Sequence, residues 1–177
     1  IGCSFTFEHS LLRHGFSIDH ISENKVVPMY STNIKNEKSG PFENTMVVSM
    51  RIFKKDQVDK IVNICKSFHW AHGKPIHVGD PNEIGISNIF KPTWGDKPRS
   101  LLKDEVNMFW ACGVTPQNAI LNSSVEFCIS HTPGYMLITD IKEDADIPLA
   151  DISQMWHDAV KDVDLNETRQ AYIKQIP

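Results

Sequence analysis

The chain has 177 residues, of which 41% are hydrophobic, and a formal net charge of −4. This length suffices for one full domain, or for one domain with a small subdomain. The longest basic cluster is Lys54–Lys55, with no aromatic residues interleaved, which argues against a nucleic acid as partner. No apolar run is long enough to cross a membrane, so we expect no membrane partner either.

The four cysteines, Cys3, Cys65, Cys112 and Cys128, are widely spaced and form no CxxC pair. A chain of this length needs no disulfide framework, so we expect free thiols in a reducing, intracellular compartment. Cys65 and Cys128 fall on apolar faces and are expected in the core. The sequence opens at Ile1 without Met or signal peptide, which we interpret as a fragment or processed product of a longer polypeptide.

The first half of the chain predicts two helices and two strands. Residues 5–14 have helical spacing of apolar side chains, and residues 26–34 are typical of an extended segment. Residues 46–53 alternate and give the clearest strand, whereas residues 56–68 form an amphipathic helix. Residues 25–70 are therefore expected to form a small α+β subdomain.

The second half predicts shorter strands that run into turns. Residues 75–78, 106–111 and 126–130 are apolar strands, and residues 135–139 resume the third. Helix starts follow the first two strands, with Asp80 and Thr115 as the expected N-caps. Near-continuous apolar strands alternating with helix starts predict a layered α/β/α domain with a mostly parallel or mixed sheet.

The composition changes again near the end of the chain. From residue 142 the sequence is acidic and polar, with one more amphipathic helical pattern. We expect residues 141–177 to be a helical tail or a linker toward a further domain, which leaves residues 1–140 as the main domain.

Three segments share one pattern in which a strand meets a small residue and then a helix start: residues 2–4, 78–81 and 112–116. In open α/β sheets ligands bind beyond the carboxyl ends of the strands, and a helix N-terminus favours an anion. The alternative is three ordinary, well-capped connections. Three such segments together favour a site for a small carboxylate.

Several single residues in these segments could carry chemistry. Cys3 and Cys112 occupy matching places next to helix starts, a setting that lowers a thiol pKa, although small buried Cys residues are common. His131 ends a predicted buried strand and could act as a general acid or base, or serve only a structural hydrogen bond. Arg51 shares a strand face with Ser49 and could clamp a carboxylate, or could form an ion pair.

Other candidates have plainer alternatives. Glu8 could complement the dipole of its helix, and Asp80 could be only a cap. His69, His72 and His77 resemble a loose metal cluster, but their spacing matches no standard zinc site, so we expect no metal.

Six motifs occur in order: residues 1–8 (IGCSFTFE), 27–34 (VPMYSTNI), 46–51 (MVVSMR), 72–81 (HGKPIHVGDP), 109–117 (FWACGVTPQ) and 131–140 (HTPGYMLITD). Together they resemble one known family, the hydro-lyases that include mitochondrial D-glutamate cyclase. The resemblance covers residues 1–140. It implies an α/β fold with a smaller inserted α+β subdomain. It also implies a segment before residue 1.

The resemblance further implies a lyase reaction, in which D-glutamate loses water to give 5-oxo-D-proline. The matched motifs supply the candidate catalytic residues Cys3, Glu8, Asp80, Cys112 and His131. They also supply the candidate substrate-binding residues Ser4, Asn33, Arg51, Gly113, Thr115 and Gln117. We expect no metal or organic cofactor.

Two other functions remain open at this stage. One is a hydro-lyase acting on another small carboxylic acid, and the other is a non-catalytic module that binds a carboxylate. The expected partner is a small amino-acid substrate, with a homo-oligomer left open. The expected location is the mitochondrial matrix for a eukaryotic source and the cytoplasm otherwise.

Overall fold

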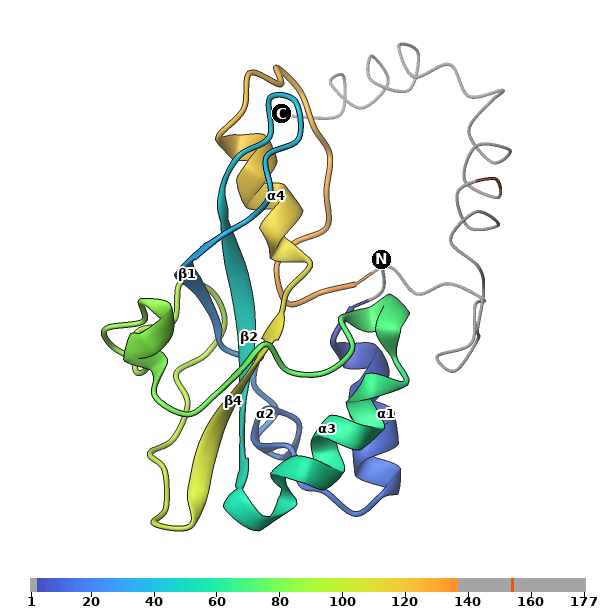
Figure 1. The fold of residues 1–177 in the computed structure, drawn as a ribbon, viewed down its shortest axis with the longest axis vertical. Coiled ribbons are helices and arrows are strands. Elements are labelled where there is room, and N and C mark those ends of the chain that lie inside the picture. The colour runs from blue at the N-terminus through green and yellow to red at the C-terminus, as the bar shows by residue number, and fades with distance from the viewer. Residues whose placement is uncertain (1–2, 137–153, 155–177) are drawn as a thin grey trace. The chain divides into compact units, whose positions relative to one another are not determined.

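A four-stranded sheet organises the part of the chain that the computed structural model describes, which is residues 3–136 and residue 154 (Figure 1). The strands are β1 (Met29–Lys35), β2 (Thr45–Lys54), β3 (His77–Val78) and β4 (Glu105–Ala111). The α-helices are α1 (Phe5–Arg13), α2 (Asp19–Ser22), α3 (Val58–Lys66) and α4 (Val114–Leu121). Three short 3-10 helices are η1 (Lys55–Gln57), η2 (His69–Ala71) and η3 (Pro81–Ile84).

The sheet has the order β1-β2-β4-β3, and every neighbouring pair is antiparallel. The central pair, β2 and β4, is continuous from Val48↔Ala111 to Lys54↔Glu105. The expected mostly parallel or mixed sheet is therefore wrong. Continuous apolar strands report that both faces of a sheet are covered, and they do not report the direction of the neighbouring strand.

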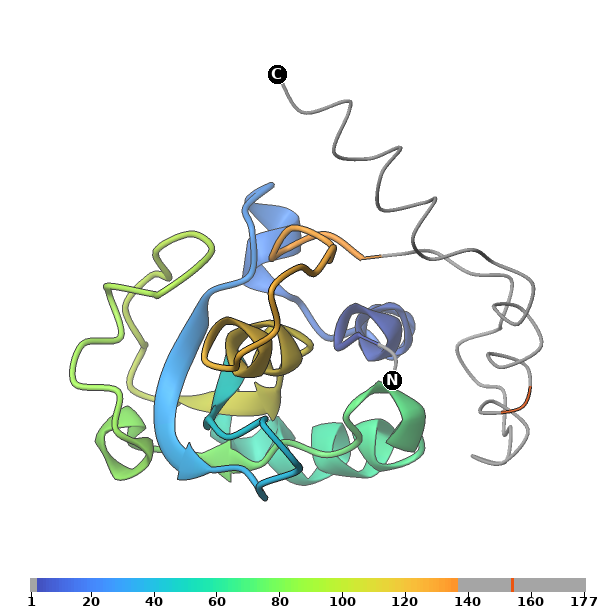
Figure 2. The ribbon, with the colours of Figure 1, turned by 90° about the horizontal axis from the view of Figure 1, so that it is seen from above.

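One face of the sheet packs against α1 and α3, which lie side by side (Figures 1 and 2). Their apolar positions recur every three or four residues, so each helix turns one apolar stripe to the sheet. The buried residues of this cluster are Phe7, Leu11, Phe16, Ile18, Phe53, Ile61, Cys65, Phe68, Ala71, Met108 and Trp110. Trp110, the largest of them, is fully buried.

The opposite face is covered by η3 and the residues that follow it. Ile84 and Ile86 pack there against Tyr30, Met50 and Phe109, which come from three different strands. Val48 and Ile52 complete the alternation of β2, since every second side chain of a strand points to the same face. The second layer, in the part of the chain described, is therefore a 3-10 segment instead of the expected layer of α-helices.

The structure confirms the predicted helices over residues 5–14 and 56–68 and the predicted strands over residues 46–53 and 106–111. The predicted strand over residues 126–130 is wrong, because that segment is irregular.

The remaining expectations concern the 25–70 subdomain, the end of the chain and membrane-spanning helices. Strands β1 and β2, from the expected 25–70 subdomain, share one continuous sheet with β3 and β4. The expected strand over 135–139 lies mostly outside the described residues, as does the expected tail over 141–177. No helix in the described part of the chain is both long enough and apolar enough to span a membrane.

The turn at Gly95 holds the start of β1. Met29 N donates to Trp94 O at 2.9 Å, and Asp96 N donates to Val26 O at 3.0 Å. Gly95 has φ +81°, and a Cβ there would lie 2.1 Å from the carbonyl oxygen of Val27. Any side chain would therefore push this turn away from β1.

We expect Gly95→Ala to lower the free energy of unfolding more than Gly15→Ala does. Both residues have left-handed φ, which costs an alanine roughly 1–2 kcal/mol. Only position 95 adds a backbone clash, because nothing lies within 4 Å of a Cβ at Gly15. Urea denaturation measures both variants, and an equal loss in the two would contradict the role given to this turn.

Candidate functional site

A buried ion pair joins β2 to α1. Arg51 Nε donates to Glu8 Oε1 at 2.7 Å, and Nη2 of the same guanidinium also donates to that oxygen. Nη1 donates to Ser49 Oγ and Nη2 to Ser4 Oγ, both at 3.0 Å. The Arg51 and Glu8 side chains are only 1% and 7% exposed. We call Ser4, Glu8, His20, Ser49 and Arg51 the Glu8–Arg51 cluster.

The sequence positions of these residues explain why they meet. Ser49 and Arg51 are two apart on β2 and therefore point to the same face, as the alternation predicted. Ser4 and Glu8 are four apart, which places them on one side of α1 and its first turn. Packing α1 on that face of β2 brings the two pairs together, and the Ser4 and Ser49 hydroxyl oxygens lie 3.3 Å apart.

Electrostatics keeps the Glu8 carboxyl ionised. Burial opposes its charge, but the Arg51 guanidinium and His20 outweigh burial, so the pKa of Glu8 lies below its ordinary value. Arg51 also lies over the Phe7 and Trp110 rings, with 5.1 Å and 5.3 Å from Cζ to the ring centroids. These apolar surroundings make the ion pair depend on close contact, because neither charge can be hydrated by bulk water.

His20, on α2, is a member of the cluster that the sequence did not indicate. Its Nε2 lies 3.1 Å from Glu8 Oε1, and its ring is 6.3 Å from the ring of Phe5. The helix that carries it has only four residues, so no periodic pattern marks His20 as inward-facing. Only the packing of α2 beside α1 makes it a neighbour of Glu8.

Cys3 is partly buried and interacts with Cys112. Cys112 is buried and interacts electrostatically with both Cys3 and Arg51. Burial raises the pKa of the Cys112 thiol, although the N–H groups of Val114 and Gly113 counteract this. The expectation of a lowered thiol pKa is therefore wrong for Cys112, because desolvation exceeds the effect of the helix start.

The two remaining cysteines differ from each other. Cys65 is fully buried, as expected, and burial raises its pKa to about 12. Cys128 is exposed, so its assignment to the core is wrong. Its predicted strand does not form, which removes the apolar face on which that assignment depended.

The candidate residues after β4 form hydrogen bonds within the fold. Gly113, not Thr115, is the N-cap of α4. The Thr115 hydroxyl instead accepts from Val47 N at 2.9 Å and donates to Val47 O at 3.2 Å. Gln117 Nε2 donates to His131 O at 3.0 Å and lies 3.3 Å from His131 Nε2 in an exposed position. Among the described contacts, none joins this Gln117–His131 pair to the Glu8–Arg51 cluster.

Asp80 and Asn33 lie near η3. Asp80 Oδ1 accepts from Asn82 N at 3.0 Å, so Asp80 is the N-cap that the sequence predicted, although of a 3-10 helix. This hydrogen bond holds the pKa of Asp80 below its ordinary value. Asn33 is exposed on β1, beside Gly85 at the end of η3. The structure thus places neither residue in contact with Glu8 or Arg51.

A small, partly open cleft lies beside His20, and its water-accessible volume is about 30 Å³. His20 and Arg51 both line it. Six charged residues also contribute to its lining: Asp19, Glu23, Lys25, Asp96, Lys97 and Arg99.

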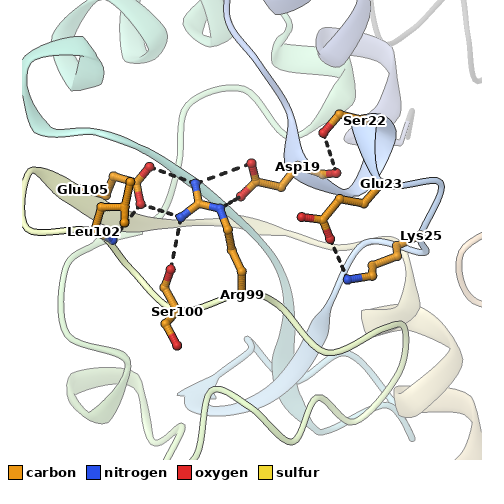
Figure 3. Close-up of polar contacts among 8 residues, drawn as sticks. All are labelled: Asp19, Ser22, Glu23, Lys25, Arg99, Ser100, Leu102 and Glu105. Carbon is orange, nitrogen blue, oxygen red and sulfur yellow. Dashed lines mark hydrogen bonds and ion pairs between the residues drawn. The ribbon is translucent and has the colours of Figure 1, made fainter.

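One wall of the cleft is fixed by Arg99 (Figure 3). Its Nε lies 2.9 Å from Asp19 Oδ2, and its Nη2 donates to Glu105 Oε1 at 2.8 Å. Burial raises the pKa of Asp19 in spite of the neighbouring Arg99. Arg99 is thus held between two carboxylates on separate elements, which ties α2 to the start of β4.

No group of three or more His, Cys, Asp or Glu side chains suited to a metal ion occurs among the described residues. Burial lowers the pKa of His72 to about 4, with a smaller effect from Arg51, so this imidazole is neutral. His77 Nε2 lies 2.9 Å from the carbonyl oxygen of Asp80, a local contact next to η3.

A carboxylate and an imidazole in close contact, with the imidazole lining a cleft among charged residues, are typical of an enzyme site for a small molecule. Comparison with known proteins identifies the family. Residues 1–140 match the D-glutamate cyclase family, and the chain belongs to it.

Bacterial relatives agree with this assignment. The chain is 50% identical over 149 residues to a protein of Dinoroseobacter shibae named "Putative hydro-lyase". It is 49% identical to proteins with the same description from Oceanobacillus iheyensis, over 144 residues, and Acinetobacter baylyi, over 145 residues. These matches cover 84%, 81% and 82% of the chain but 49%, 57% and 53% of the relatives. The chain therefore spans about half the length of the curated relatives it matches.

We expect Arg51→Met to lower the free energy of unfolding by about 3–5 kcal/mol, because it leaves the Glu8 carboxylate buried without its main partner. Lys38→Met is the matched control, since Lys38 pairs with Glu43 at 2.9 Å on the exposed surface and should contribute little. Chemical denaturation at neutral pH measures both. A loss at Arg51 as small as that at Lys38 would show that the ion pair does not hold α1 on the sheet.

We expect Glu8 to make stability depend on acid pH. Its folded pKa lies below the ordinary 4.5, so the unfolded chain binds the proton first as pH falls. The stabilisation is complete above the unfolded pKa and is lost as pH falls through the folded value. Chemical denaturation at several pH values between neutral and acid gives the free energy of unfolding at each pH. Below the ordinary Glu pKa of 4.5, this free energy should fall less steeply with decreasing pH in Glu8→Gln than in the wild type. The exposed Glu37→Gln variant is the control, and an unchanged slope in Glu8→Gln would refute the assignment.

Proposed function

We propose that the protein to which this chain belongs is a hydro-lyase that cyclises D-glutamate to 5-oxo-D-proline and water. The match of residues 1–140 to the D-glutamate cyclase family carries the proposal. The names of the relatives support the class of reaction. The geometry supports it through a fixed acid–base pair, Glu8 and His20, next to a cleft with charged walls.

The reaction moves two protons from the substrate nitrogen to a γ-oxygen while a new bond forms between the nitrogen and the γ-carbon. The substrate has one ammonium and two carboxylates. The nitrogen loses two protons and bonds to the γ-carbon, and one γ-oxygen leaves with both of those protons as water. Net charge is −1 on both sides. The enzyme must therefore remove protons from nitrogen, stabilise charge on the tetrahedral carbon centre, and deliver protons to the leaving oxygen.

The matched motifs supply groups for the charge that develops. Backbone N–H groups after Cys3–Ser4 and Cys112–Gly113 are proposed to stabilise the oxyanion. Helices α1 and α4 begin there. The Ser4 side chain makes no capping hydrogen bond to α1, and Gly113, the N-cap of α4, has no side chain that could cap it.

The Glu8–Arg51 pair suits a positioning role. The Arg51 guanidinium already bonds to Glu8, Ser4 and Ser49, so it orients these groups more readily than it clamps a substrate. A thioester on Cys112 is disfavoured, because burial raises its thiol pKa and a carboxylate is a poor electrophile. The roles proposed for Cys3, Asp80, His131, Asn33, Thr115 and Gln117 stay predictions from the motifs.

A hydro-lyase acting on another small carboxylic acid is the second candidate. The names of the relatives state the class of reaction but no substrate, which favours keeping this alternative. The mixed charges of the cleft would suit several amino or hydroxy acids.

The test is incubation of the full-length protein with D-glutamate and, separately, L-glutamate, with 5-oxoproline followed by chiral chromatography. We expect product from the D-isomer alone. Glu8→Gln should lower the rate strongly, whereas Lys38→Met, which changes an exposed pair, should not. Absence of product from both isomers, with turnover of another acid, would replace the first candidate by the second.

A further inference from the structure

We propose that His20 is the residue that carries protons in this reaction and that the cleft beside it holds the reacting end of the substrate. The inference deepens the proposed function and rests on it for the identity of the substrate. Nothing in the matched motifs includes His20, which lies between the first two of them. The proposal comes from the geometry of the Glu8–Arg51 cluster and the cleft.

One nitrogen of the His20 imidazole lies against the Glu8 carboxylate. Glu8 Oε1 lies 3.1 Å from His20 Nε2, and the same carboxylate oxygen accepts from Arg51 Nε at 2.7 Å. A carboxylate this close to one ring nitrogen favours the tautomer protonated at that nitrogen, which leaves a lone pair on the other nitrogen. Arg51 therefore orients Glu8, Glu8 orients His20, and Nδ1 is the atom able to exchange protons.

The position of His20 fits a role in proton transfer. It is only 9% exposed, yet it lines the cleft, and it is the only histidine among the described residues that does so. A buried imidazole that reaches a cleft can meet a ligand without being surrounded by bulk water. By contrast, the candidate general acid or base from the sequence, His131, is exposed beside Gln117.

The charges around the cleft leave one cation available. Arg99 is held by Asp19 and Glu105, and Lys25 is paired with Glu23 at 2.5 Å. Lys97 makes no ion pair with any described residue, and its Nζ lies 5.4 Å from the Phe90 ring centroid. A substrate carboxylate can therefore bind Lys97 without breaking an existing pair.

The carboxylates of the cleft suit the other end of the substrate. Asp19 stands on the same short helix as His20, Glu23 is the C-cap of that helix, and Asp96 accepts from Val26 N at 2.7 Å. An ammonium group would be attracted to this side and brought toward the imidazole. The lining thus matches a molecule with one ammonium and carboxylates, the charge pattern of the proposed substrate.

The proton path follows from the overall reaction. His20 Nδ1 takes one proton from the ammonium, and the nitrogen lone pair forms the bond to the γ-carbon. The imidazolium then returns its proton to the γ-oxygen. Transfer of the second nitrogen proton to that oxygen breaks the C–O bond and releases water, with no external acid, base or oxidant required. A single imidazole that accepts and returns protons suits a reaction in which both transfers run between the same two atoms.

His20→Gln tests the assignment, because the amide can keep a donor toward Glu8 but cannot carry a proton. We expect kcat to fall by about 10²–10⁴-fold with little change in KM. The acid limb of the pH profile of kcat/KM should disappear in this variant. The variant keeps Glu8, Arg51 and the other charged residues that line the cleft. His14→Gln is the control, because His14, the C-cap of α1, is exposed and its Nδ1 lies 2.8 Å from Ser10 O. Equal rates for His20→Gln and wild type would overturn the proposal.

A second measurement separates this inference from the proposed function. The imidazole signals of the full-length protein are followed by NMR during titration with D-glutamate and then with glutarate, with His20 assigned through His20→Gln. We expect the His20 signal to move and the His14 signal to stay. A shift without turnover would reject D-glutamate cyclisation while supporting the cleft as a binding site. Turnover without a shift at His20, or neither effect with either compound, would overturn the inference.

Discussion

The charge of Arg51 in the interior is the constraint on which this structure depends. A guanidinium between Phe7 and Trp110 cannot be hydrated, so it must find acceptors within the fold. It finds them on the first turns of α1 and on its own strand. The position of α1 on the sheet is therefore set by hydrogen bonds as well as by apolar packing.

This single requirement connects the parts of the candidate site. Glu8 is needed to neutralise Arg51, and the same carboxylate oxygen lies 3.1 Å from Nε2 of His20 on α2. The short helix α2 is in turn tied to β4 through Asp19, Arg99 and Glu105. The Glu8–Arg51 ion pair thus adjoins a cleft that Arg51 lines and whose wall is held by Asp19, Arg99 and Glu105. Because its members act as one unit, changes at any of them should affect the others in a non-additive way.

The local elements were accessible to sequence reasoning because their signals are local. Helical spacing in residues 5–14 and alternation in residues 46–53 determine which side chains share a face, and the structure confirms both. The predicted common face of Ser49 and Arg51 followed directly from that alternation. The strand prediction for residues 126–130 was wrong, because a short apolar run without a pairing partner is compatible with irregular structure.

The sequence by itself determined the family, the main helices and strands, and the common strand face of Ser49 and Arg51, because motifs and periodicity are properties of the chain's order. Only the tertiary structure decided the antiparallel sheet, the raised pKa of Cys112, the exposure of His131 and the place of His20 beside Glu8. Strand direction, desolvation and contacts between distant segments all depend on how elements pack. His20 and Glu8 are twelve residues apart on two helices, and no spacing rule relates them until both helices lie against the same part of the molecule.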